Sequence, residues 1–237
     1  MGKKKKLVKR GKWWFRGLKK VMSIRYKEPK FIFLGEEFED GSVILSNHEG
    51  TDAPMSLEMY LDKPLRMWGT HEMNSGLRKM YAYQTKVYYH EKKGWNLFLA
   101  RLFCLLASPL TNLFYSGFTL ISTYKDERFM KTIKESLETV RNKQSIVIFP
   151  EDSKNGYLPQ LEGFFLGFAA FAEVALKRGI DLPIVVSYFN KKEKTYIFDN
   201  PVKYSELKKY GSKEEIAQKL LERCNELGRM SFAENKG

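Results

Sequence analysis

Two polar clusters in this chain of 237 residues each follow an apolar run, and the first has residue types suited to acid–base chemistry. It comprises Asn47, His48 and Asp52 in the stretch SVILSNHEGTDAP. A histidine exchanges a proton near neutral pH, and a carboxylate that accepts from one ring nitrogen fixes the tautomer of the ring. Asp52 comes four positions after His48, within reach if the turn is helical. The pattern indicates either a general base with its carboxylate or an ordinary loop histidine.

The second cluster follows the run SIVIF, where Pro150 cannot continue a strand ladder. Glu151, Ser153 and Lys154 come directly after this proline. On its own the cluster is also compatible with a plain polar junction between a strand and a loop. Because reactive groups in α/β sheets gather where strands end, we expect the two clusters to meet in one crevice. His71 follows another apolar run and could line the same pocket.

The elements that must position these residues can be read from hydrophobic periodicity. Seven short apolar runs predict strands at residues 31–34, 42–46, 65–69, 118–122, 145–149, 183–188 and 194–198. Helical spacing covers residues 127–141 and 163–178, and Ser212 with Glu215 forms a capping-box start for a helix that runs to about Arg229. This alternation predicts an α/β fold, a single layered domain with a mainly parallel sheet flanked by helices.

The formal net charge of +13 is concentrated at the N-terminus. Residues 1–30 hold thirteen Lys and Arg against one acid, Glu28, so this arm carries +12. The body of the protein, residues 31–237, is therefore nearly neutral, which disfavours a basic cleft for nucleic acid across it. A nucleic-acid binder that uses the arm alone is the least favoured class of function.

The arm has the pattern of an amphipathic helix. A turn of about 100° per residue gathers its apolar side chains on one side, namely Leu7, Trp14, Leu18, Val21 and Met22. The opposite side carries Lys9, Lys12, Arg16, Lys19, Lys20 and Ser23. Tryptophan prefers the boundary between water and lipid, and clustered Lys and Arg are drawn to anionic headgroups by about 1 kcal/mol each. The arm therefore predicts a peripheral contact with an anionic membrane surface, against a solvated tail or an RNA-binding arm.

The remaining composition favours the cytoplasmic side of a membrane. Cys104 and Cys224 are too few for a disulfide framework and lack the spacing of metal ligands, which fits a reducing compartment. No secretory signal segment follows the basic N-terminus. The run 97–110 is strongly apolar, but Arg101 interrupts it, and we expect no window of the roughly 18 apolar residues that a spanning helix needs. The run is either a core helix or a second, shallow membrane contact.

Four stretches, in order, make the sequence resemble the glycerolipid acyltransferases typified by 1-acylglycerol-3-phosphate acyltransferase. They are NHEGTD at 47–52, GFTLIST at 117–123, FPEDSK at 149–154 and LPIVVSYF at 182–189. The first and third stretches are the specific ones, and the resemblance extends from about residue 31 to residue 198. It implies the fold of that family for residues 31–237, preceded by the basic amphipathic arm.

The resemblance also implies an activity in phospholipid biosynthesis. A fatty acyl group would pass from acyl-CoA or acyl carrier protein, as co-substrate, to a hydroxyl of a lysophospholipid or related glycolipid. His48 would deprotonate the hydroxyl as it attacks the thioester, without an acyl-enzyme, and Asp52 would hold the imidazole. No metal and no further cofactor are implied. The site for the acceptor would be shaped by Asn47, Glu151, Ser153 and Lys154.

The sequence also departs from the family's pattern. The spacing from His48 to Asp52 is one residue shorter, Asp152 and Lys154 replace a glycine and an arginine, and the second block lacks its arginine, the next one being Arg128 in the following helix. An ammonium contacts phosphate less directionally than a guanidinium does, so the acceptor need not be a glycerol phosphate. The alternative function is a catalytically inactive, membrane-surface lipid-binding protein on the same scaffold.

Overall fold

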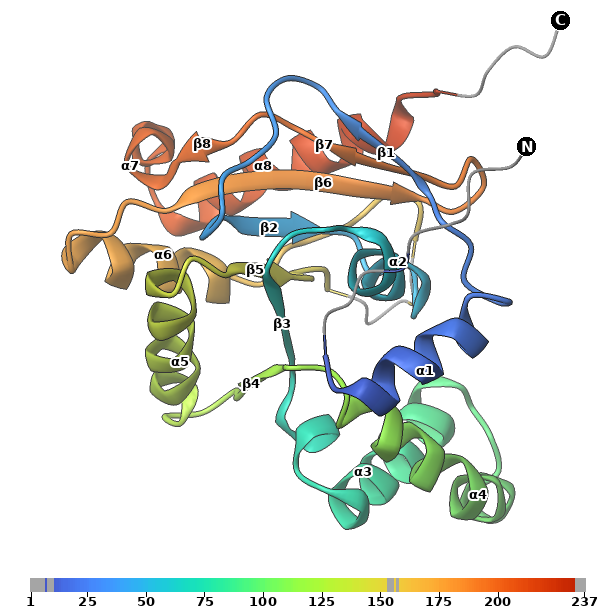
Figure 1. The fold of residues 1–237 in the computed structure, drawn as a ribbon. Helices are drawn as coiled ribbons and strands as arrows, with labels where there is room; N and C mark the ends of the chain where they lie inside the picture. The colour runs from blue at the N-terminus through green and yellow to red at the C-terminus, as the bar shows by residue number, and fades with distance from the viewer. Residues whose placement is uncertain (1–6, 8–10, 153–155, 157, 233–237) are drawn as a thin grey trace, which may run out of the picture.

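The structure, a computed structural model, describes residue 7 and residues 11–152, 156 and 158–232. Within these residues, eight strands form one mixed, mostly parallel sheet flanked by helices, which is an α/β fold (Figure 1). The strands are β1 (Lys30–Phe33), β2 (Val43–Ser46), β3 (Leu65–Thr70), β4 (Ile121–Thr123), β5 (Ser145–Ile148), β6 (Pro183–Asn190), β7 (Thr195–Phe198) and β8 (Val202–Lys203). Their order across the sheet is β1-β7-β6-β2-β5-β3-β4, and β8 pairs with β6.

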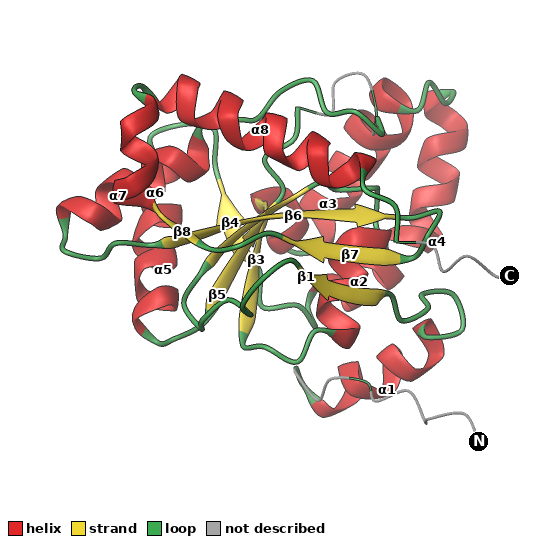
Figure 2. Ribbon diagram, turned by 90° about the horizontal axis from the view of Figure 1, so that it is seen from above, coloured by secondary structure: helices red, strands yellow, loops and turns green. Residues whose placement is uncertain are grey.

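Helices cover both faces of this sheet. They are α1 (Trp13–Met22), α2 (Asp52–Tyr60), η1 (His71–Asn74), α3 (Leu77–Tyr83), η2 (Gln84–Lys92), α4 (Leu97–Tyr115), α5 (Phe129–Arg141), α6 (Gly167–Lys177), α7 (Tyr204–Leu207), η3 (Lys208–Tyr210) and α8 (Lys213–Arg229). One core cluster joins the sheet to α5, α6 and α8, and a second joins the other face to α1 and α2. Figure 2 shows α8 and α1 on opposite sides of the sheet. Helices α3 and α4 lie together beyond the ends of β3 and β4 (Figure 1).

The centre of the sheet brings the ends of the relevant strands together. β2 lies between β5 and β6 and is parallel to both, with Leu45 opposite Ile148 and Ser46 opposite Ser187. β3 is parallel to β5 on the far side of it. Since parallel strands present their carboxyl ends at one edge, the loops after β2, β3 and β5 are neighbours.

Most of the expected elements are confirmed. A strand overlaps each of the seven expected ranges, although β4 begins at Ile121, three residues later than expected, and the pairing is mainly parallel, as predicted. The helices expected at 127–141 and 163–178 are α5 and α6, and both begin later in the chain than expected. Ser212 caps α8 with both hydrogen bonds of the capping box, as predicted. The sequence did not predict β8, because two residues are too short to form a recognisable apolar run.

Helix α4 is longer than the expected run 97–110. It extends over the 19 residues Leu97–Tyr115 and is, in the part of the chain that the structure describes, the one helix long and apolar enough to cross a membrane. The expectation that no segment reaches this length is therefore wrong. The reason is that the helix continues through Pro109, although a proline at that position costs an internal hydrogen bond.

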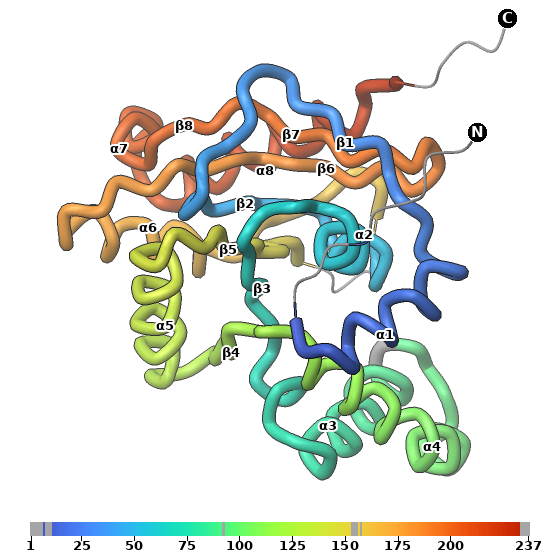
Figure 3. The backbone as a smooth tube through the Cα atoms, in the orientation of Figure 1, coloured from blue at the N-terminus to red at the C-terminus, as the bar shows by residue number. Residues whose placement is uncertain are grey.

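Helix α1 packs on the body of the protein, between α2 and α4 (Figure 3). Phe15 is buried in the core, with its ring centroid 5.8 Å from that of Phe114 and 5.4 Å from that of Phe118. Lys19 is 0% exposed, forms an ion pair with Glu58 of α2, and donates to the carbonyl oxygen of Glu58 at 3.2 Å. Periodicity puts Lys19 on the solvated side of the arm, and this expectation is wrong because α2 supplies a buried carboxylate there.

Of the apolar side chains expected on one side of the arm, Leu7, Trp14, Leu18 and Met22 pack on protein, whereas Val21 is 65% exposed, and for Val21 the expectation is wrong. Trp13 and Val21 are exposed together with the basic Arg16 and Lys20. Lys9 lies outside the described residues. A side that mixes tryptophan, an aliphatic residue and basic residues is still typical of a helix at a membrane surface. The membrane contact of the arm stays a prediction, now through this exposed side.

Candidate active site

The loop after β2 is anchored by the side chain of Asn47. Its Nδ2 donates to the carbonyl oxygen of Phe189 at 3.1 Å, and its Oδ1 accepts from the amide of Phe189 at 2.7 Å. These bonds extend the pairing of β2 with β6 by one step, through a buried side chain. Both ends of this amide are thus held by main chain, so Asn47 fixes the position of His48. The expected contact of Asn47 with an acceptor stays a prediction.

The chain turns sharply between His48 and Asp52. Glu49 and Gly50 have φ angles of 43° and 65°, in the left-handed region. Glycine adopts such angles without steric cost, so Gly50 is the residue that makes the turn possible. The amide of Asp52 donates to the carbonyl oxygen of Glu49 at 3.3 Å, and α2 begins at Asp52. The ring of His48 packs against Phe149, with the centroids 4.8 Å apart.

The loop after β5 meets this turn directly. The Oε2 atom of Glu151 accepts a hydrogen bond from the backbone amide of His48 at 2.8 Å. The main chain on both sides of Glu151 is held by hydrogen bonds between residues 150–152 and 163–165. Glu151 of the second cluster therefore lies in one crevice with His48 of the first, as their positions after neighbouring parallel strands predict.

The environment of Glu151 changes its acidity. Burial of this side chain, which belongs to a residue only 7% exposed, raises the pKa of its carboxyl to about 6. The hydrogen bond from His48 acts in the opposite direction, and the charge of Glu49 raises the pKa further. Burial also raises the pKa of Glu49, against the attraction of Lys191. Carboxyl groups with raised pKa values cluster at functional sites, because they can exchange protons closer to neutral pH.

Both oxygens of the Asp52 carboxylate contact cations. The Oδ1 atom lies 3.2 Å from Nη1 of Arg25, and Oδ2 lies 2.8 Å from Nζ of Lys191. Arg25 follows α1, and Lys191 follows β6. These contacts tie the N-terminus of α2 to two segments that are distant in sequence. The role that the resemblance gives Asp52, to hold the imidazole of His48, stays a prediction.

Two cavities meet at His48. The smaller has a volume of about 120 Å³ and is mostly apolar, with Met55, Met67, Phe114, Phe118 and Leu120 among its walls. The larger is an open cleft of about 800 Å³ between the ends of β3, β4 and β5 and the start of α6. Both are lined by His48, Trp68, Gly69, Thr70 and Phe149. His48 therefore borders both a small, mostly apolar space and a larger cleft whose walls include the charged side chains of Lys125, Asp126 and Arg128 beside apolar ones.

The larger cleft is lined by His71, as the sequence suggested, and by Arg128, which the sequence did not assign to the site. Arg128 contacts both carboxylate oxygens of Asp126, with Nη2 to Oδ2 at 2.6 Å and Nε to Oδ1 at 2.9 Å. These bonds lower the pKa of Asp126 to about 2. The guanidinium lies over the ring of Tyr124 at 4.7 Å, and that ring stacks on His71 at 4.9 Å. Arg128 reaches the larger cleft because β4, which precedes it in the chain, pairs with β3. Helical periodicity in the sequence does not predict this strand pairing.

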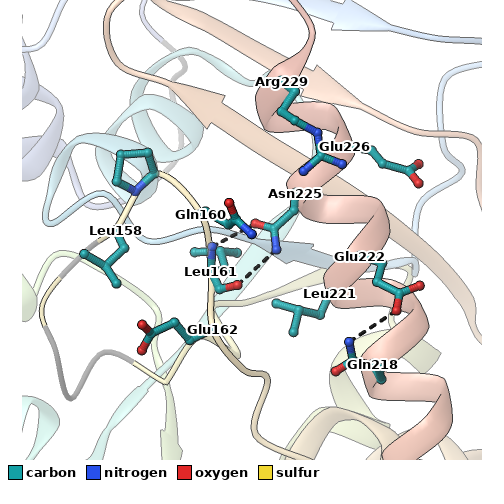
Figure 4. Close-up of a pocket in the computed structure, with 11 residues that line it drawn as sticks. Leu158, Gln160, Leu161, Glu162, Gln218, Leu221, Glu222, Asn225, Glu226 and Arg229 are labelled. Carbon is teal, nitrogen blue, oxygen red and sulfur yellow. Dashed lines mark hydrogen bonds between the residues drawn. The ribbon is translucent and has the colours of Figure 1, made fainter.

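Two expected site residues cannot be placed, since Ser153 and Lys154 lie outside the described residues. A separate open cleft of about 900 Å³ lies between residues 158–162 and α8, where Asn225 holds the main chain of Leu161 through bonds of 2.8 and 3.0 Å (Figure 4). Among the expected site residues that the structure describes, none lines this cleft. The candidate site is therefore the crevice around His48.

The described residues contain no group of three or more His, Cys, Asp or Glu side chains that could hold a metal ion. Comparison with protein-family models finds no match for this chain, and no curated protein matches it. The geometry of the crevice, the chemistry of its side chains and the four sequence stretches together are what support a proposal of function.

Proposed function

We propose that this protein is an acyltransferase with the fold of the glycerolipid acyltransferases, which moves a fatty acyl group from acyl-CoA or acyl carrier protein to a hydroxyl of a lysophospholipid or related glycolipid. The observation that carries the proposal is the position of His48, which lines both a small, mostly apolar cavity and a wider open cleft that also carries the charged side chains of Asp126 and Arg128. An acyl chain and a polar acceptor need two such compartments, with a base between them.

In the proposed reaction His48 is the general base. Its ring takes the proton of the acceptor hydroxyl while the oxygen forms a bond to the carbonyl carbon of the thioester. The tetrahedral intermediate then expels the thiolate, which receives the proton from the imidazolium, and the ester is released without an acyl-enzyme. A positioned base of this kind contributes roughly 10²- to 10⁴-fold to a rate. Asp52 holds the imidazole in the required tautomer.

The oxyanion of that intermediate requires hydrogen-bond donors. Gly167, the first residue of α6, lines the larger cleft, and the amides of a first helical turn have no partner within their helix. These amides are the proposed donors. Phe165 and Leu166, just before the helix, line the same cleft. The start of α6 is therefore next to the space in which the thioester would react.

The acceptor would lie in the larger cleft. The carboxylate of Glu151 holds the loop of His48 by accepting a hydrogen bond from the backbone amide of His48. In the proposal, Glu151 also shapes the end of the site that receives the polar group of the acceptor, together with Asn47, Ser153 and Lys154. Arg128 is a further cation on the wall of this cleft, and an acidic headgroup could take the place of Asp126 on its guanidinium, which contacts two oxygens at once. The acceptor class of the proposal is accordingly an acidic or strongly polar lyso-lipid.

Lipid substrates favour a peripheral enzyme at the cytoplasmic face of a membrane. The basic residues of the first 30 positions and the exposed Trp13 of α1 support this location, because together they suit an anionic membrane surface. A role in lipid metabolism, within phospholipid biosynthesis, follows from the same proposal.

The proposal is tested by incubating the purified protein with radiolabelled acyl-CoA or acyl carrier protein thioester and a panel of lysophospholipid and glycolipid acceptors. We expect a labelled ester with at least one combination of donor and acceptor. The matched control is the His48→Ala variant, which should form none. An absence of product across the whole panel, with a folded protein and lipid binding intact, would contradict the proposal.

A second candidate is a lipid-binding protein without catalysis on the same scaffold. The observation that favours it is the pair of contacts from Asp52 to Arg25 and Lys191, since they engage the carboxylate that the acyltransferase mechanism needs at the imidazole. This candidate predicts stoichiometric binding of lyso-lipid with no consumption of thioester. Turnover of one donor and acceptor pair excludes it.

A further inference from the structure

Helix α4 exposes an apolar surface along its whole length. Eight large apolar side chains on it are between 44% and 79% exposed, namely Phe98, Leu99, Leu102, Phe103, Leu105, Leu106, Leu110 and Leu113. Only 17% of its most apolar window is buried, and the mean hydropathy of that window is 1.7. The helix is about 28 Å long at 1.5 Å per residue. A contiguous apolar surface of this size is unusual on a protein surrounded by water alone.

The opposite side of α4 is fixed to the protein. Ala100, Cys104 and Ser108, at spacings of four residues, are buried, and helices α3 and η2 pack against α4. The hydroxyl of Ser108 donates to Oε1 of Gln84 in η2 at 2.7 Å. The helix is therefore one arm of a hairpin with α3 and η2, and its exposed side is the side that faces away from this hairpin.

The charges of the hairpin decide how it can meet lipid. Its tip carries His90, Glu91 and Lys93, all exposed, and Arg101 is exposed near the start of α4. Driving this tip into hydrocarbon would require charged groups at the centre of the bilayer, which is costly. Laying the hairpin flat instead buries the apolar side and leaves the tip in the headgroup region. Trp95, next to the tip, suits the same boundary, where its amphipathic ring is favoured.

We propose that α4 lies in the plane of a lipid bilayer, with its exposed apolar side chains among the acyl chains. Two features next to α4, the basic helix α1 and the apolar cavity at His48, favour lipid as the molecule that covers its exposed side. Phe114 near the end of α4 contacts Phe15 of the basic helix α1, and Phe114 and Tyr115 line the apolar cavity at His48. One consequence rests on the proposed function: an acyl chain would reach His48 from the leaflet along the end of α4.

The membrane contact is tested with an environment-sensitive fluorophore on a cysteine at Leu106, which is 79% exposed, using the full-length Leu106→Cys protein. The native cysteines, Cys104 and Cys224, are buried and should not react while the protein is folded. The matched control is Met130→Cys on α5, because Met130 is 56% exposed on a different part of the molecule. Phosphatidylcholine vesicles are used in about 0.5 M sodium chloride, where surface charge is screened.

We expect the fluorophore at position 106 to shift to shorter wavelength and to be quenched by nitroxide on the lipid acyl chains, and the fluorophore at position 130 to do neither. Equal responses at both positions would overturn the proposal. In a second measurement, Leu106→Glu lowers the partition constant for these vesicles by about tenfold or more, and Met130→Glu leaves it unchanged.

The competing occupant of this surface is a second copy of the chain. Sedimentation velocity without lipid separates the two: a wild-type dimer that Leu106→Glu abolishes, together with an unchanged partition constant, would overturn the membrane contact. These measurements use neither donor nor acceptor. A failure of acyl transfer therefore leaves their outcome intact, and their failure leaves acyl transfer untouched.

Discussion

The carboxylate of Glu151 accepts a hydrogen bond from the backbone amide of His48 at 2.8 Å. The two residues are 103 positions apart in sequence, and the bond joins the loops that follow β2 and β5. It fixes the main chain of the proposed base, and His48 lines both cavities. Burial raises the pKa of this carboxyl to about 6 and the hydrogen bond from His48 acts in the opposite direction, so the position of His48 is linked to the protonation of Glu151.

The first prediction concerns this hydrogen bond. Glu151→Ala removes the acceptor of the His48 amide, and leaving a buried donor unsatisfied costs about 1–3 kcal/mol of unfolding free energy. Glu151→Gln keeps an acceptor oxygen and should be much closer to the wild type. Urea denaturation of the three proteins at pH 4, below the window in which Glu151 titrates, provides the comparison. An alanine variant as stable as the glutamine variant would show that the bond does not hold the loop.

The second prediction is the pH dependence of stability. The folded pKa of Glu151, about 6, lies above the usual value of 4.5, so the folded state keeps a proton that the unfolded state has lost in this window. Stability should therefore fall as pH rises from about 4.5 to about 6, by on the order of 2 kcal/mol. Glu151→Gln lacks this titration. The difference in unfolding free energy between variant and wild type should grow across the window, and a constant difference would refute the assignment.

The third prediction concerns the buried ion pair that docks α1 on α2. Lys19→Met removes the ammonium that pairs with the buried carboxylate of Glu58, and breaking a buried ion pair on one side typically costs about 3–5 kcal/mol. Lys20→Met, at the exposed neighbouring position, should change stability by less than about 0.5 kcal/mol. The double variant Lys19→Met with Glu58→Leu should recover most of the loss. Equal stability of the two single variants would show that α1 is not docked through this pair.

The fourth prediction concerns the acceptor. Arg128→Gln should raise the KM for acceptors that carry a phosphate by about tenfold, the effect of one charged hydrogen bond, and leave neutral acceptors unchanged. Arg141→Gln is the matched control, since Arg141 is exposed at the other end of α5. Steady-state kinetics with one phosphate-bearing and one neutral lyso-lipid measure both effects. An equal change in KM for the two acceptors would remove Arg128 from headgroup recognition.

The sequence predicted the strands and the meeting of His48 with Glu151, for a physical reason. Apolar runs that end abruptly in polar residues are typical of buried parallel strands, and the carboxyl ends of neighbouring parallel strands lie at one edge. β2 and β5 are such neighbours, so residues far apart in sequence had to come together. The capping box at Ser212 was equally predictable, because it depends on two residues close in sequence.

The contacts that the sequence could not predict are those made by long side chains between distant elements. Helical periodicity separates two sides of α1, but it does not say which side packs on protein, and Lys19 was therefore assigned to solvent. The cations that contact Asp52 are Arg25, which follows α1, and Lys191, which follows β6, and both are far from Asp52 in sequence. The cleft position of Arg128 depends in the same way on strand order and not on local pattern.

The central claim is that His48 is the base of an acyl transfer, and one rate measures it most directly. With the best donor and acceptor pair, we expect His48→Ala to lower the transfer rate by roughly 10²- to 10⁴-fold, with unchanged vesicle binding and unfolding free energy. His90→Ala, at an exposed histidine that lines neither cavity at His48, is the control and should keep the wild-type rate. A His48→Ala variant that transfers acyl groups as fast as the wild type would contradict the account.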